Sequence, residues 1–272
     1  MRYRMHGVVH IIDVNEGDGM SYSEKTIAGM FHNRAERYQY ETCVKFKDQG
    51  SYVAISWNEM ARRVVNLGLG LISLGVKKGD IVAIFSDNRW EWLAADLAVL
   101  SIGAADAPIY ATNSGEEAAY IINDSGAKVC FVSGKEHLER ILSVRAKVKG
   151  LKKIITFDDV ATSDKNILGL GAVMALGDRA KDKRIFDERL NDTTADDLAT
   201  LIYTSGTTGS PKGVMLTHRN FIANVHQCYA SHASHLSHQD EALAILPWSH
   251  SFGRTVGVYL MLHIGAVISL AE

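Results

Sequence analysis

The sequence contains little cysteine and no excess of charge of one sign. Its three cysteines among 272 residues, Cys43, Cys130 and Cys228, are isolated and form no pair with metal-ligand spacing. Isolated free thiols are typical of a reducing compartment, so we expect a cytoplasmic protein. The net charge is −2 and no block of basic residues stands out. The sequence therefore gives no reason to expect a nucleic-acid partner.

Long apolar runs are also scarce. The N-terminus has no signal-peptide core, because charges interrupt its first residues and Asp13 follows Ile11-Ile12. The stretch Val256–Ala271 is mostly apolar, but it is shorter than the about 20 residues that span a bilayer, and His263 and Gly265 divide it. We expect a helix followed by a strand there, and no transmembrane segment.

Short apolar runs alternate with segments of helical periodicity along most of the chain. Ser56 with Glu59, and Ser114 with Glu117, have the spacing of capping boxes that begin helices. The expected strands are 81–85, 105–108, 128–132, 153–157, 198–203, 242–246 and 266–270. The expected helices are 56–75, 89–102, 114–125, 135–148, 218–231 and 252–263. This alternation predicts an α/β fold, with parallel sheets covered by helices on both faces.

The N-terminal part departs from this alternation. Cys43–Phe46 and Tyr52–Ile55 lie either side of a short polar turn and predict an N-terminal β-hairpin. Residues 177–197 are dense in Asp, Lys and Arg, which indicates a solvated connector. We expect an extension (1–20), a first α/β subdomain (21–176), the connector (177–197) and the start of a second α/β subdomain (198–272).

The loop Thr204-Ser-Gly-Thr-Thr-Gly-Ser-Pro-Lys-Gly213 follows the apolar strand 198–203. Its three glycines let the backbone turn its N–H groups toward an anion. Its five hydroxyls add donors or a magnesium ligand, and Lys212 adds a positive charge. The loop is no Walker A motif, because Gly213 follows Lys212, and no nucleophile elbow, because Tyr203 stands where that motif needs glycine. It predicts a phosphate-binding site, with Thr217 capping the next helix.

The segment Tyr203-Thr-Ser-Gly-Thr-Thr-Gly-Ser-Pro-Lys-Gly-Val-Met-Leu-Thr-His218 resembles the phosphate-binding signature of the adenylate-forming superfamily. Within that superfamily the chain is most similar to bacterial long-chain fatty acyl-CoA ligases. The supporting segments are Phe85–Trp92, Leu100–Tyr110, Ser114–Tyr120 and Leu246–Arg254. The resemblance runs from about Ser21 to the end, and implies the N-terminal part of the acyl-CoA synthetase-like large domain.

The resemblance also implies roles for individual residues. Thr204 matches the family's magnesium-ligating threonine. The residues that match those around the ATP phosphates are Thr204, Ser205, Gly206, Thr207, Thr208, Gly209 and Lys212. His250 matches a histidine that lines the acyl pocket. Arg254 is left open between a pocket residue and a solvated helix charge.

The implied activity joins a long- or medium-chain fatty acid to ATP, giving acyl-adenylate, and then to coenzyme A. The family's catalytic lysine, magnesium-sharing glutamate and adenine and ribose contacts are expected beyond Glu272, so we expect a fragment that is inactive alone. The alternatives are an aryl-CoA ligase, a carrier-protein adenylation domain, or a non-catalytic nucleotide-binding module. The implied partners are the carboxylic acid, ATP, magnesium and coenzyme A; contact with a membrane surface and a homodimer stay open.

Overall fold

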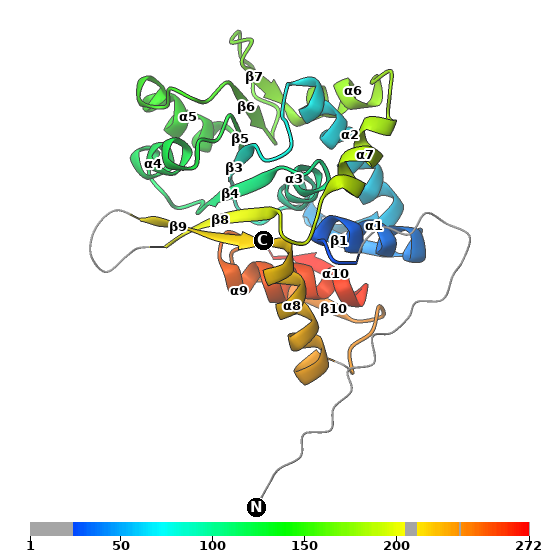
Figure 1. Ribbon diagram of the computed structural model, residues 1–272. Helices are drawn as coiled ribbons and strands as arrows, with labels where there is room; N and C mark the ends of the chain where they lie inside the picture. The colour runs from blue at the N-terminus through cyan, green and yellow to red at the C-terminus, as the bar shows by residue number, and fades with distance from the viewer. Residues whose placement is uncertain (1–23, 205–210, 234, 272) are drawn as a thin grey trace, which may run out of the picture.

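Two sheets with helices between and around them make up the computed structural model, which describes residues 24–204, 211–233 and 235–271 (Figure 1). Their strands account for all seven strands expected from the sequence, although the ends shift by a few residues. In spatial order, the larger sheet consists of β7 (Ile167–Gly169), β6 (Lys153–Thr156), β5 (Val129–Val132), β3 (Ile81–Phe85), β4 (Ala105–Ile109), β8 (Leu198–Thr204) and β9 (Lys212–Thr217). Neighbouring strands of this sheet run parallel, except β8 and β9, which pair antiparallel.

The smaller sheet joins strands from opposite ends of the sequence. Its order is β10 (Glu241–Ala244), β11 (Val267–Leu270), β1 (Thr42–Asp48) and β2 (Ser51–Ser56). Strands β1 and β2 pair antiparallel, which confirms the expected hairpin, while β1 pairs in parallel with β11. The sheets therefore cross the expected boundary at 177–197: the N-terminal hairpin extends the smaller sheet, and β8 and β9 complete the larger one. The division into subdomains stays a prediction.

Helices cover both faces of the larger sheet, as expected. The helical elements are α1 (Ile27–Tyr38), α2 (Trp57–Ser73), α3 (Trp90–Ser101), α4 (Gly115–Ser125), α5 (Lys135–Ser143), α6 (Leu170–Asp178), α7 (Arg184–Asp192), α8 (His218–Cys228), α9 (Ser251–Arg254) and α10 (Met261–Ile264). A 3-10 turn follows α5 at Arg145–Lys147, and π-helical turns occupy Tyr229–Ala233 and Thr255–Leu260. The side chains of α4 and α5 pack on one face of β3 and β5, and those of α2 and α3 pack on the other.

The prediction that residues 177–197 form a solvated connector is partly wrong. Residues 184–192 form helix α7, which buries Phe186 and Leu190 in the main core. These two positions are four residues apart and lie on one helical face, so the charged residues between them can still face solvent.

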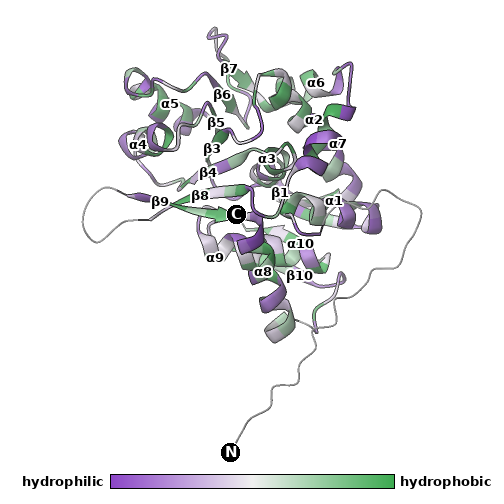
Figure 2. Ribbon diagram, viewed as in Figure 1, coloured by the Kyte–Doolittle hydropathy of each residue, from purple (hydrophilic) through white to green (hydrophobic). Residues whose placement is uncertain are grey.

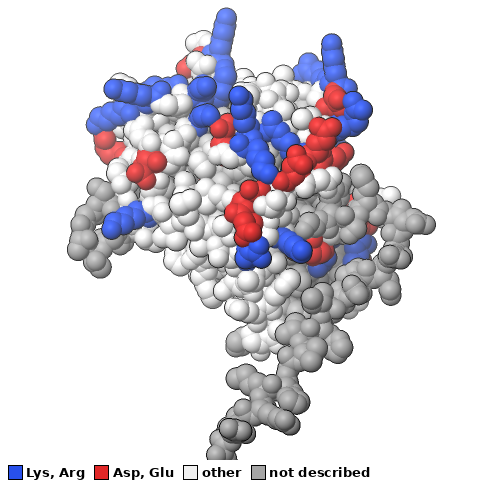
Figure 3. Space-filling view, in the orientation of Figure 1, with Lys and Arg blue, Asp and Glu red and all other residues white. Residues whose placement is uncertain are grey.

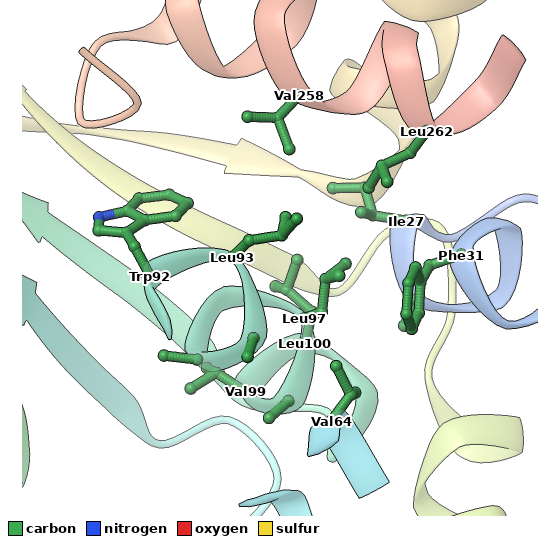
Figure 4. Close-up of a cluster of buried hydrophobic side chains, with 14 of the residues drawn as sticks. Ile27, Phe31, Val64, Trp92, Leu93, Leu97, Val99, Leu100, Val258 and Leu262 are labelled. Atoms are coloured by element: carbon green, nitrogen blue, oxygen red, sulfur yellow. The ribbon is translucent and has the colours of Figure 1, made fainter. Parts of the chain in front are cut away.

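The main core lies between the two sheets, with α3 at its centre. In Figure 4, Leu93, Leu97 and Leu100 of α3 point toward Ile27 of α1 and toward Val258 and Leu262 of the C-terminal helical segment. Helix α3 is buried nearly all round, as a helix between two sheets must be. This packing holds both sheets to the same helix.

Close helix packing explains two glycines of α2. A Cβ added to Gly70 would lie 2.2 Å from the carbonyl oxygen of Val173 in α6, and one added to Gly68 would lie 2.7 Å from the Phe186 ring. Gly177 of α6 approaches α2 equally closely, since its Cβ would lie 1.8 Å from the Asn66 carbonyl oxygen. The glycine pair of α2 therefore allows close packing against α6 and α7.

The expected capping boxes are confirmed in one case and half confirmed in the other. Ser114 and Glu117 exchange both hydrogen bonds, and Gly126 ends α4 in a left-handed conformation. Ser56 caps α2 by accepting from the Glu59 backbone N–H, but the Glu59 carboxylate pairs with Arg63 instead. Asn220 provides the reciprocal bond for a box that begins at Thr217.

The outer surface is polar over the larger sheet's helices. Apolar residues concentrate in the central strands and in α3, and polar ones on the outer helices (Figure 2). On the face shown in Figure 3, charged side chains of both signs gather over the upper part of the molecule, and the area around α8 is largely uncharged.

Cys43 and Cys130 are buried free thiols, and burial raises the pKa of Cys130 to about 12. None of the helices in the part of the chain that the structure describes has the length and apolar character of a membrane span.

Candidate active site

The two ends of the phosphate-binding motif are held together by an antiparallel hairpin. Strand β8 ends at Thr204 and β9 begins at Lys212, and these two residues face each other in the pairing register. Tyr203 pairs with Gly213 at the next position. Both Thr204 and Lys212 have exposed side chains. The hairpin therefore presents a hydroxyl and an ammonium group side by side, whatever path the connecting loop takes.

Two tyrosines attach this hairpin to α4. The Tyr120 hydroxyl donates to the Pro211 carbonyl oxygen at 2.8 Å, and the Tyr203 hydroxyl donates to the Asp124 carboxylate at 2.7 Å. Burial raises the pKa of Tyr203, and the Asp124 carboxylate raises it further, so its hydroxyl stays a donor. A Cβ at Gly213 would lie 3.1 Å from the Tyr203 ring, so a glycine lets the ring lie across β9.

The loop expected from the sequence, Thr204–Gly213, is longer than the segment that connects β8 and β9 in the structure. Lys212 and Gly213 lie in β9, which the sequence analysis missed, and the strand ends at Thr217, where the expected helix cap is confirmed. Ser205, Gly206, Thr207, Thr208 and Gly209 lie outside the described residues. Their assignment to the ATP phosphates stays a prediction.

The donors at the hairpin ends fit a magnesium–phosphate ligand. The Thr204 hydroxyl is a neutral oxygen ligand of the kind magnesium accepts, and magnesium takes few protein ligands because it keeps water and phosphate oxygens. Lys212 adds a point charge that can pair with phosphate oxygens. Within the described ranges, no group of three or more His, Cys, Asp and Glu side chains is placed to bind a metal.

His250 lies just before α9 and is exposed, so it is not a core histidine. Its Nδ1 accepts a hydrogen bond from the Phe252 backbone N–H at 3.2 Å, which caps the short helix. A neutral ring capped in this way carries its proton on Nε2. The predicted role of His250 in an acyl pocket is not tested by this geometry.

Arg254, by contrast, is completely buried in a cluster of polar groups that the sequence analysis did not predict. Its guanidinium binds the carboxylates of Asp96 and Asp106, the latter through Nη1 at 2.8 Å. It also donates to the hydroxyls of Thr200 at 2.9 Å and Tyr259 at 2.6 Å. Burial raises the pKa of Asp96 well above its usual value, and the charge of Asp106 adds to this. Neither expected role fits, because Arg254 is fully enclosed.

An open cavity of about 530 Å³ lies elsewhere, at the carboxyl ends of β3 and β5. The residues that line it include 87–91, 133–137 and 158, but not Thr204, Lys212 or His250. Arg89 lines this cavity, but its guanidinium is already bound by the carboxylates of Glu91 and Asp158. One lining residue, Asn88, binds the backbone of Leu246 and Trp248, so the cavity adjoins the segment before His250.

The fold is that of adenylate-forming enzymes. A crystal structure of the anthranilate CoA ligase AuaEII superposes with a TM-score of 0.78 at 20% identity, over 93% of this chain and 46% of that one. A long-chain-fatty-acid-CoA ligase (FadD1) from Archaeoglobus fulgidus superposes with a TM-score of 0.73 at 24% identity, over 92% of this chain and 48% of that one.

The chain belongs to the AMP-binding enzyme family, whose model matches residues 31–272. It is 34% identical over 209 residues to long-chain-fatty-acid–CoA ligase FadD15 of Mycobacterium bovis, which covers 77% of this chain and 34% of that protein. It is 36% identical over 227 residues to fatty acyl-CoA synthetase A of Dictyostelium discoideum, covering 81% of this chain and 33% of that protein. The chain thus spans about a third of the length of these curated relatives.

Proposed function

We propose that the protein activates a long- or medium-chain fatty acid with ATP and transfers the acyl group to coenzyme A. The observation that carries this proposal is the β8–β9 hairpin, which sets Thr204 and Lys212 opposite each other at the ends of the phosphate-binding motif. The names of its curated relatives support a fatty acid as the substrate.

The physical difficulty of the first step is that a carboxylate must approach a polyanion. The carboxylate oxygen forms a bond to the α-phosphorus of ATP, and the bond from that phosphorus to the bridging oxygen breaks as pyrophosphate leaves. Lys212 would neutralise the charge that develops on pyrophosphate, and the loop N–H groups and hydroxyls would add hydrogen bonds. Magnesium, held in part by Thr204, would supply further charge neutralisation.

The second step transfers the acyl group from AMP to coenzyme A. The coenzyme A thiol gives up its proton to solvent, its sulfur bonds to the acyl carbon, and AMP leaves with the electron pair of the broken C–O bond. His250 would lie against the acyl group.

The isolated 272 residues are proposed to be inactive. This chain has no assigned counterparts of the glutamate that shares the magnesium, the adenine and ribose contacts or the C-terminal lysine. Phosphate binding alone does not place the α-phosphorus against a carboxylate.

The test is product formation by the complete protein that contains this chain. Purified protein is incubated with ATP, magnesium, coenzyme A and a panel of fatty and aryl acids, and thioesters are detected by mass spectrometry. We expect fatty acyl-CoA, and pyrophosphate release that needs both ATP and fatty acid. Preference for aryl acids would indicate an aryl-CoA ligase, transfer only to a carrier protein would indicate an adenylation domain, and ATP binding without turnover would indicate a nucleotide-binding module.

A further inference from the structure

Arg254 is tied by its backbone to the segment that carries His250. The Arg254 backbone N–H donates to the His250 carbonyl oxygen at 3.0 Å, and the His250 backbone N–H donates to the Pro247 carbonyl oxygen at 3.1 Å. Helix α9 is the first turn of a helical segment that continues through the π-helical turn Thr255–Leu260 into α10. Arg254 therefore anchors the N-terminal end of this segment, directly after His250.

The side chain of Arg254 reaches the other half of the candidate site. Thr200, to which it donates, lies on β8 four residues before Thr204, which corresponds to about 13 Å along a strand. The Thr200 hydroxyl also donates to Asp106 at 2.6 Å. Thr200 and Asp106 form the pair in register between β4 and β8. Arg254 thus binds at the place where the strand leading to Thr204 joins the rest of the sheet.

We propose that Arg254 is a positioning residue that holds the His250 segment and the strand carrying Thr204 in a fixed relation. It does so by binding Asp96 of α3, Asp106 of β4 and Thr200 of β8 at the same time. In the proposed reaction, on which this inference rests, this would keep the acyl end and the phosphate end of the substrate site at a constant separation.

The chemistry of the cluster favours positioning over simple stabilisation. Apolar side chains of similar volume often stabilise a protein as well as a buried ion pair does, so stability alone does not require a buried charge. A guanidinium offers five N–H donors in a planar fork, which sets the angles between several acceptors; a lysine cannot replace it. The Arg254 Cζ also lies 5.3 Å from the centre of the Trp92 ring and 5.6 Å from that of the Phe221 ring. These rings leave the guanidinium few other orientations.

The test compares Arg254→Lys and Thr200→Val with Ile141→Ala in the complete protein. Ile141 is a fully buried residue of α5 on the opposite face of the larger sheet, so its truncation destabilises the protein without touching the cluster. Turnover and KM for adenylation are measured by pyrophosphate release, at a temperature where each variant is folded. Hydrogen exchange is followed by mass spectrometry in the segments 198–204 and 247–254.

We expect Arg254→Lys to lower the adenylation kcat by about 100-fold, because a small misplacement of reacting groups is costly, and to change the KM for ATP little. Both segments should exchange faster in this variant. Ile141→Ala should keep most of its turnover and leave exchange in both segments unchanged. Equal behaviour of Arg254→Lys and Ile141→Ala in turnover and exchange would overturn the proposal.

If Arg254→Lys does not fold, Thr200→Val tests whether the cluster positions the two segments. This substitution removes one hydroxyl and keeps the shape of the side chain. Faster exchange in 198–204 with reduced kcat supports the proposal, and exchange and kcat unchanged from wild type overturn it. If the wild type adenylates no acid, the proposed function fails, but exchange still decides whether Arg254 fixes the two segments.

Discussion

The β8–β9 hairpin and the α9 segment both hold predicted site residues, but by different physical means. The hairpin fixes Thr204 and Lys212 through backbone pairing and two tyrosine hydrogen bonds, and leaves their side chains exposed. The α9 segment leaves His250 exposed but is anchored by Arg254, which is completely buried among carboxylates. Substitutions in the hairpin should therefore change function more than stability, and substitutions around Arg254 should change both.

Removing a carboxylate from the buried cluster should have the largest effect. In Asp106→Ala, Arg254 loses one of its two carboxylate partners and Thr200 loses its acceptor. We expect the free energy of unfolding to fall by about 3–5 kcal/mol, as when a buried ion pair is broken on one side. Urea unfolding measures the change. The exposed residue Asp159 provides a control, since Asp159→Ala should stay within about 0.5 kcal/mol of wild type; similar losses in both variants would show that the cluster contributes little.

Lys212→Ala should separate function from stability at the hairpin. The side chain is exposed, so its loss should change the free energy of unfolding by less than about 0.5 kcal/mol. Adenylation by the complete protein should fall by about 10²–10³-fold, the cost of removing one group that stabilises a developing charge. Lys152→Ala, at an exposed position before β6, is the matched control and should be active. A collapse of stability with unchanged pyrophosphate release would assign Lys212 a structural role.

His218, the first residue of α8, should make the free energy of unfolding depend on pH. Burial lowers the pKa of His218 to about 4, and its Nδ1 accepts from the Ile27 backbone N–H. The unfolded chain takes up this proton near pH 6.5, so the stabilisation is complete above that pH and is lost as the pH falls toward 4.

Between pH 7 and pH 4 the wild type should lose about 3 kcal/mol more than His218→Asn, which keeps an acceptor but does not titrate. Urea unfolding at several pH values measures this difference. Parallel pH profiles of the two proteins would contradict the buried neutral histidine. His32, whose pKa burial also lowers to about 4, contributes equally to both profiles.

Thr217→Ala should have the smallest effect. Thr217 ends β9 and caps α8, with its hydroxyl accepting from the Asn220 backbone N–H. We expect a loss of about 1 kcal/mol in the free energy of unfolding, recovered by Thr217→Ser, which keeps the cap. Thermal unfolding of both variants provides the comparison, and an equal loss in Thr217→Ser would mean that packing of the methyl group matters more than the cap.

What could be predicted from the sequence is mostly local. Apolar runs and caps predicted most strands of both sheets and the start of α8, because these depend on neighbours a few residues away. Strand β7 and helices α1 and α6 were not predicted. Strand β9 was missed because, as the edge strand of the larger sheet, it has no continuous buried face. Helix α7 was missed because only Phe186 and Leu190 are buried on it.

The partners of Arg254 could not be predicted for a different reason. Asp96 and Asp106 lie 158 and 148 residues earlier in the chain. Only the pairing of β4 with β8, and the placement of α3 between the two sheets, brings them to the arginine. The motif around His250 predicts an exposed site residue, but it contains no signal for the buried anchor four residues later.

Binding of ATP with magnesium to the complete protein, followed by hydrogen exchange, locates the nucleotide on the structure. We expect ATP to slow exchange in peptides covering the hairpin, 198–217, and Lys212→Ala to weaken the binding measured by calorimetry. Slower exchange confined to the cavity segments 87–91 and 133–137, with equal affinity of wild type and Lys212→Ala, would contradict this expectation.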